Sequence, residues 1–140
     1  MSEARELRGY LFINSAMSDA QRAVQAAHAA VEIYHKNKTD ALCAEWAESH
    51  KTLILLDGGY HGAMLNNYAE LTRMCKKLSL PYAAFFEDFE TMNHLFTGFG
   101  AIIPNHIYDM DIPPEYLDPE YPLWYDQQLA VFLRNFRLLK

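Results

Sequence analysis

The alanine-rich stretch from Gln21 to Tyr34 restricts the fold most strongly, because it reads QRAVQAAHAAVEIY and has the periodicity of a helix. Helical spacing places four polar residues on one stripe: Gln21, Gln25, His28 and Glu32. It places six apolar residues on the opposite stripe: Ala20, Ala23, Val24, Ala27, Val31 and Tyr34. Since alanine side chains are short, we expect the apolar stripe to pack closely on a sheet and the polar stripe to stay available for chemistry.

Strands and helices alternate on both sides of this segment. Residues 8–15 read RGYLFINS and have the continuous apolar centre of a strand buried on both faces, and Ser18 or Asp19 can cap the helix that follows. The other expected elements, in chain order, are a helix over 40–49 with Trp46 towards the core, a buried strand over 52–57, a helix over 62–78, and strands over 82–86 and 99–103. The order is βααβαββ.

This order predicts a single three-layer α/β domain with a mixed sheet of about four strands. Residues 108–120 read YDMDIPPEYLDPE and contain five acids, three prolines and no base, which is typical of an extended, solvated segment. A helix is expected over 124–139. We therefore divide the chain into an α/β domain over 1–107 and, over 108–140, an acidic arm and C-terminal helix packed on that domain.

The charge and composition exclude several classes of protein. A net charge of −6 opposes generic nucleic-acid binding, because such proteins gain much of their affinity from Lys and Arg. No apolar run is long enough to span a membrane, and the first ten residues carry charges, so we expect a cytoplasmic protein with no membrane contact. Cys43 and Cys75 have no C-x-x-C spacing and are expected to be packing residues.

Within the predicted helix, the sequence QAAHAA resembles the first-helix signature of the class II, archaeal and eukaryotic type of peptidyl-tRNA hydrolases, roughly G-K-x-A-x-Q-x-x-H-A. Gln25, His28 and Ala29 match this signature. The position of the family's lysine is occupied by Gln21, and the nearby cation, Arg22, comes one residue later. The resemblance covers about residues 8–104, and it implies the same βααβαββ order.

A second motif supports the resemblance more weakly. The family has a sequence like D-A-G-R-T, then a turn containing threonine and a strand ending in G-x-G-P, and the corresponding stretch here is EDFETMNHLFTGFGAIIP. Its landmarks in this chain are Asp88, Thr97, Gly98, Gly100 and Pro104. The residues after Asp88 differ from the family's pattern, and Thr91 takes the place of its first threonine.

The resemblance implies a cytoplasmic hydrolase that cleaves the ester between a peptide and the 3′ ribose of a tRNA, without a cofactor or a metal. Asp88 would orient or deprotonate the water, and Thr91 or Thr97 would hold the ester or ribose. Gln21 would donate to the oxyanion in place of the lysine, and losing one such donor commonly costs ~10²–10³ in rate. The residues expected to bind substrate are Arg22, Gln25 and His28.

An alternative function follows from the lost lysine. The same cleft would then be a catalytically impaired binding module that captures a smaller nucleotide, an RNA end or a protein partner. At the level of single residues, Gln25 and His28 have a structural interpretation too, as side chains that hydrogen-bond a neighbouring strand. Asp88 beside Glu87 has one as a solvated strand end.

Three further clusters have competing interpretations. One group has ligands that suit a divalent metal but matches no known metal-binding spacing: Glu87, Asp88, Glu90 and His94. A second group either contacts phosphate or stabilises the end of its helix: Arg73, Lys76 and Lys77. A third, on the terminal helix, either forms a homodimer contact or packs on its own sheet: Leu129, Phe132, Phe136 and Leu139.

Overall fold

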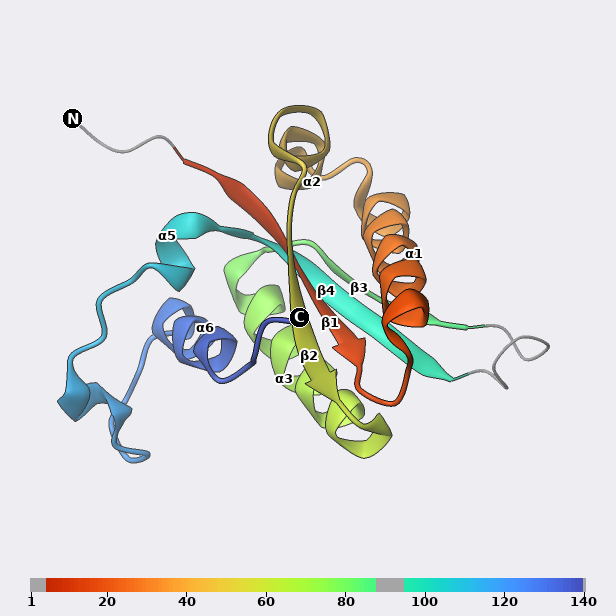
Figure 1. The fold of residues 1–140 in the computed structure, drawn as a ribbon. Helices are drawn as coiled ribbons and strands as arrows, with labels where there is room; N and C mark the ends of the chain where they lie inside the picture. The colour runs from red at the N-terminus through yellow and green to blue at the C-terminus, as the bar shows by residue number, and fades with distance from the viewer. Residues whose placement is uncertain (1–4, 88–94, 140) are drawn as a thin grey trace.

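The computed structural model describes residues 5–87 and 95–139 (Figure 1). Its elements up to the fourth strand are β1 (Leu7–Asn14), α1 (Asp19–Asn37), α2 (Ala41–Glu45), the π-helical turn η1 (Trp46–His50), β2 (Thr52–Gly59), α3 (His61–Leu78), β3 (Tyr82–Phe86) and β4 (Phe96–Pro104). Three short helical elements follow: α5 (Asn105–Tyr108), the 3₁₀ turn η2 (Pro114–Leu117) and α6 (Tyr125–Arg134). The α/β class and the βααβαββ order are confirmed.

The four strands form one mixed sheet in the order β2-β1-β4-β3. β1 pairs in parallel with β2, and β4 pairs antiparallel with both β1 and β3. We expected a buried strand at β2, but β2 lies at the sheet edge, and Leu53 is 43% exposed. The C-terminal residues pair with this edge, because Asp57 N–H donates to the Arg137 carbonyl at 2.9 Å and Leu139 N–H donates to the Leu55 carbonyl at 3.0 Å.

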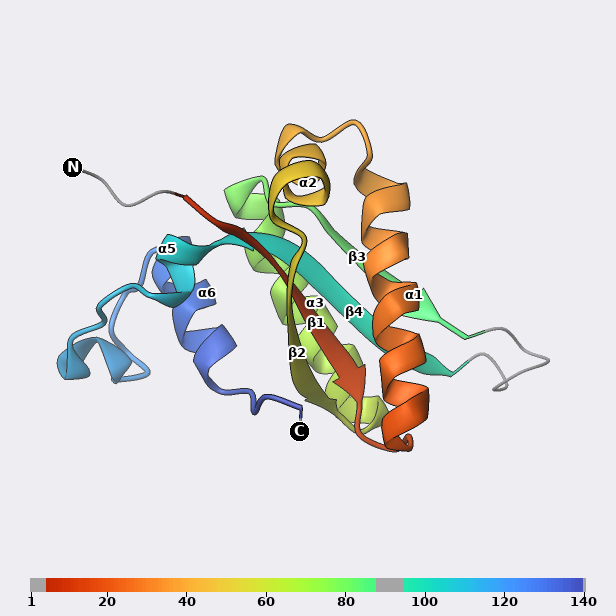
Figure 2. The same cartoon turned by 45° about the horizontal axis from the view of Figure 1, so that its top comes forward.

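Helices cover both faces of the sheet and make three layers (Figure 2). α1 and α2 lie on one face, over a core that includes Leu11, Ile13 and Ile33, and Trp46 is buried there as expected. α3 and α6 lie on the other face, over a core that includes Phe12, Leu71 and Leu133. Among the described residues no helix is long and apolar enough to cross a membrane.

The face of α1 that packs on the sheet differs from our expectation. The buried residues are Gln25, Ala26, Ala29 and Ile33. The stripe predicted to dock is exposed instead: Val24 by 51%, Val31 by 67% and Tyr34 by 46%. The physical reason lies in β4, where a Cβ added to Gly98 would meet the Ala29 Cβ at 3.3 Å and one added to Gly100 would meet Ile33 Cδ1 at 3.1 Å. The two glycines make room for Ala29 and Ile33 and so select this face.

The terminal helix packs on its own chain. Leu129 and Leu133 of α6 are fully buried, and α6 contacts α3 and α5. The rings of Phe132 and Phe136 lie 5.8 and 4.8 Å from the ring of Phe12 on β1. The packing interpretation of this stripe is confirmed, but the helix expected over 124–139 is too long. α6 ends at Arg134, and Phe136 and Leu139 lie beyond it, because the residues around Leu139 pair with the edge of β2.

Candidate functional site

A buried polar network connects α1 to the adjacent ends of β3 and β4. Gln25 Nε2 donates to Glu87 Oε2 at 2.8 Å, and Thr97 Oγ1 donates to Gln25 Oε1 at 2.8 Å. The exposed fractions of Gln25, Glu87 and Thr97 are 2%, 7% and 0%. A carboxylate at this depth is costly to desolvate, so its position is set by the hydrogen bonds around it.

His28 stands beside this carboxylate and reaches solvent. Its Nδ1 lies 3.5 Å from Glu87 Oε2, and its side chain is 41% exposed. The ring meets Phe85 edge-on with centroids 4.8 Å apart. The 3.5 Å separation is an ion-pair distance but is too long for a well-formed hydrogen bond, and a small closing movement would make one. One side of the imidazole therefore faces a buried carboxylate and the other faces water.

Local structure explains why these residues meet. Gln25 and His28 are three residues apart and so share one flank of α1. Along β3, the alternation of side chains puts Ala83 and Phe85 on the α1 side, and Glu87 continues that row. The Glu87 N–H donates to the Leu95 carbonyl at 2.9 Å, which extends the pairing of the two strands to the network.

Thr97 joins the network because β4 contains an irregularity. Phe85 pairs with Gly98 and Phe86 pairs with Phe96, so Thr97 is the additional residue of a β-bulge. Gly98 faces Ala29 of α1, and Thr97 also reaches α1 through Gln25. In a regular strand two consecutive residues point to opposite faces, so the bulge is what turns Thr97 towards the helix.

Asn14 holds the neighbouring backbone in place. Its Nδ2 donates to the Phe96 carbonyl at 2.9 Å, and its Oδ1 accepts from the Ala16 N–H at 2.8 Å. The first bond fixes the end of β1 to the start of β4, and the second fixes the turn that leads into α1. Asn14 is 1% exposed, so it acts as a buried support for the strand end that carries Thr97.

Of the residues predicted for the site, the structure brings together Gln25, His28 and Thr97. Gln21 lies on the exposed first turn of α1, where its side-chain oxygen accepts from the Ser18 N–H at 3.0 Å in a capping box. Its Nε2 remains available as a donor. Asp88 and Thr91 lie outside the described residues.

Arg22 lies away from the network. Its Nη2 donates to the Ser15 carbonyl at 2.9 Å, and its Nε is buried without a hydrogen-bond partner among the described residues. It lines a hollow of about 330 Å³ together with Asp19, Ala23, Leu55 and Leu139. This hollow lies next to β2, whereas His28 and Glu87 lie next to β3, so the structure does not bring Arg22 to the other predicted residues.

Glu87 is the residue that sequence reasoning did not place in the site. We considered it as part of a metal cluster and as the neighbour of Asp88. The period of two along β3 was the signal that would have identified it, since Ala83, Phe85 and Glu87 fall on one face. Of the residues proposed for that cluster, Glu87 alone is described, and the described residues contain no group of three or more metal-ligating side chains.

The two cysteines are placed as packing residues. Both are fully buried and free. Burial raises the pKa of the Cys75 thiol to about 12, and burial also raises the pKa of the Cys43 thiol. A thiol that resists ionisation is a poor nucleophile, so neither side chain is suited to catalysis.

The basic residues near the end of α3 are partly used within the chain. Arg73 donates to Glu70 at 2.9 Å and to Gln128 of α6 at 3.0 Å, and the Glu70 hydrogen bond raises the Arg73 pKa. Lys77 Nζ lies 5.7 Å from the centre of the Tyr125 ring. The contacts to Gln128 and Tyr125 attach α3 to α6, and phosphate binding at this position stays a prediction.

No protein-family model and no curated protein matches the chain. The arrangement around Glu87 therefore has to be interpreted from its own chemistry. A buried carboxylate beside a half-exposed imidazole is an arrangement in which the ring can act towards water as a proton acceptor.

Proposed function

We propose that the chain is a divergent hydrolase of the class II peptidyl-tRNA hydrolase type, which cleaves the ester of peptidyl-tRNA or of another acylated, nucleotide-bearing substrate. One observation carries the proposal. Glu87, held by Gln25 at 2.8 Å, lies 3.5 Å from Nδ1 of a histidine that reaches solvent. Gln25 and His28 are also two residues on which the resemblance to that family rests.

In the proposed reaction His28 is the general base and Glu87 is its positioning residue. The exposed ring nitrogen takes a proton from water as the water oxygen attacks the ester carbonyl carbon. After the small movement that closes the 3.5 Å gap, Glu87 accepts a hydrogen bond from Nδ1–H and stabilises the imidazolium as it forms. The imidazolium then returns the proton to the ribose oxygen as the bond between that oxygen and the carbonyl carbon breaks. The products are a free 3′ hydroxyl and a peptide carboxylic acid, which releases its remaining proton to solvent.

Gln21 is the proposed donor to the oxyanion. It precedes Gln25 by one helical turn, and its side-chain oxygen is already engaged by the Ser18 N–H, which leaves the NH₂ group to donate. A neutral amide stabilises a negative charge less than an ammonium group does. We therefore expect the enzyme to be slower than a family member that has the lysine.

The test is multiple-turnover hydrolysis of a peptidyl-tRNA by the wild type, His28→Asn and His35→Asn. His35 is a matched control because it is an exposed histidine on the same helix. We expect His28→Asn to lower kcat by about 10²–10⁴, the usual contribution of a general base, while His35→Asn has no effect. Equal turnover by wild type and His28→Asn would refute the assigned role.

A binding module is the second candidate, and Gln21 at the position of the family's lysine favours it. The four described side chains that meet in the network are Gln25, His28, Glu87 and Thr97. A buried carboxylate and neutral polar groups then suit a ligand with amide or hydroxyl donors. Stoichiometric binding of an acylated RNA end without product, with turnover appearing in Gln21→Lys, would support this function over the enzyme.

A further inference from the structure

α1 carries a second apolar face, opposite the face that packs on the sheet. We call it the outer stripe, and it consists of Ala20, Ala23, Val24, Ala27, Ala30, Val31 and Tyr34. Val31 is 67% exposed and Val24 is 51% exposed. A helix that is apolar on two opposite faces is typical of one that is covered on both sides. Val24, Ala27 and Val31 are exposed, whereas Ala30 packs partly against the core that contains Trp46.

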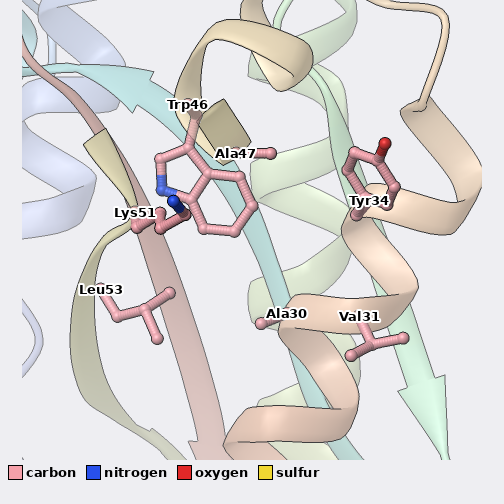
Figure 3. Close-up of a pocket in the computed structure, with 7 residues that line it drawn as sticks. All are labelled: Ala30, Val31, Tyr34, Trp46, Ala47, Lys51 and Leu53. Atoms are coloured by element: carbon pink, nitrogen blue, oxygen red, sulfur yellow. The ribbon is translucent and has the colours of Figure 1, made fainter. Parts of the chain in front are cut away.

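A groove continues the outer stripe towards β2 (Figure 3). It has a volume of about 330 Å³ and is lined by Ala30, Val31, Tyr34, Trp46, Ala47, Lys51 and Leu53. Figure 3 shows Tyr34 and Trp46 on opposite sides of it. The indole is held in place, because Trp46 Nε1 donates to the Thr52 carbonyl at 2.9 Å. The groove is therefore a preformed apolar surface with Lys51 as its one charged lining residue.

The outer stripe is complementary to itself. Suppose that α1 of a second copy lies antiparallel on α1 of the first, with Ala27 of both copies on the two-fold axis. The numbers of two residues that face each other across the axis then add to 54. Each large side chain then faces an alanine: Val24 faces Ala30, Val31 faces Ala23, and Tyr34 faces Ala20. Large residues opposite small ones allow two helices to interdigitate at a short distance. The pairing also directs Val24 towards Ala30, which lines the groove.

The charges at the two ends of α1 favour the same antiparallel arrangement. Asp19 lies in the first turn with its side chain 91% exposed and 3.9 Å from Arg22 Nη1, so this end carries both signs, whereas His35 and Lys36 lie in the last turn, followed by Lys38. An antiparallel pair brings Asp19 of one helix to the basic last turn of the other, and it also opposes the two helix dipoles. A parallel pair would place the two basic last turns together.

We propose that the outer stripe and groove form a homodimer interface, in which α1 packs antiparallel on α1 of a second copy around Ala27. The interface is isologous, so each copy contributes the same residues. The 19 residues of α1 span about 28 Å, which gives a contact at the small end of the range for stable complexes. The dimer is therefore reversible and depends on concentration. This proposal is independent of the proposed catalytic activity.

Sedimentation equilibrium over a range of micromolar concentrations tests whether the outer stripe and groove form the dimer interface. We expect a monomer–dimer equilibrium for the wild type and at least about a tenfold larger dissociation constant for Val31→Glu, which would bury an unpaired charge. Leu117→Glu is the matched control, because Leu117 is 57% exposed on η2, a separate element from the interface. Unchanged circular dichroism and melting temperature would show that Val31→Glu is folded. A monomeric wild type, or a Val31→Glu dimer as tight as the wild type, would overturn the proposal.

Disulfide formation tests the position of the two-fold axis. Ala27→Cys puts two thiols next to each other across the axis, so mild oxidation should link the two copies. Ala20→Cys is the control, because Cys at that position would face Tyr34 of the second copy instead of another thiol. The native Cys43 and Cys75 are fully buried and should not react in either variant. Equal linking of Ala20→Cys and Ala27→Cys would overturn this register.

Discussion

Replacing Gln25 by leucine tests whether the buried network is a structural unit, because leucine has a similar volume but no hydrogen-bonding group. The change removes the charge-assisted bond to Glu87 and the acceptor for Thr97, both at 2.8 Å. A bond to a charged group contributes roughly 1.5–3 kcal/mol and a neutral one about 1 kcal/mol. We therefore expect Gln25→Leu to lower the free energy of unfolding by roughly 2.5–4 kcal/mol.

Urea unfolding followed by circular dichroism measures this loss as a lower midpoint with an unchanged slope. A double-mutant cycle with Thr97→Val as the second change shows whether the loss comes from the hydrogen bond between Gln25 and Thr97. Once Gln25 is leucine, Thr97→Val should cost less than it does in the wild type, because the hydroxyl has already lost its acceptor. A Gln25→Leu protein as stable as the wild type, or two strictly additive changes, would refute the structural unit.

Other predictions concern the core. Between about pH 9 and pH 12 the Cys75 thiol should be neutral in the folded protein and ionised in the unfolded protein. The free energy of unfolding of the wild type should therefore fall by about 1.4 kcal/mol per pH unit. Urea midpoints should show a less steep fall in Cys75→Ala. Gly100→Ala should be strongly destabilising, because its Cβ would lie 2.3 Å from the Tyr10 carbonyl oxygen. In contrast, a Cβ at Gly62, in the first turn of α3, would meet open space, so Gly62→Ala should raise the free energy of unfolding by about 0.5–1 kcal/mol. Equal melting temperatures for the two alanine variants would contradict this packing.

The order of elements could be predicted from the sequence, because each strand and helix has its own pattern. Pro81 and the apolar spacing of 62–78 predicted the end of α3, and the structure ends that helix at Leu78. The face of α1 that meets the sheet could not be predicted in the same way. Both faces of α1 are apolar, and the choice depends on Gly98 and Gly100, which are distant in the sequence.

The candidate site was partly predictable for a similar reason. Gln25 and His28 share a helix flank, which spacing alone reveals. The participation of Thr97 depends on a β-bulge, and a bulge is a property of how two strands pair. The role proposed for Glu87 depends on the distance from its carboxylate to His28, which only a folded structure provides.

The most direct test of the proposed function is the multiple-turnover hydrolysis of peptidyl-tRNA by the wild type, Glu87→Gln and Asp88→Asn. Glutamine keeps the size of the Glu87 side chain but lacks the full negative charge that would stabilise an imidazolium. We predict turnover by the wild type and a fall in kcat of at least about tenfold in Glu87→Gln, with folding preserved. Asp88→Asn reports separately on the water-positioning role predicted from the sequence. Full activity in Glu87→Gln, or no turnover by the wild type, would contradict a hydrolase that works through the His28–Glu87 pair.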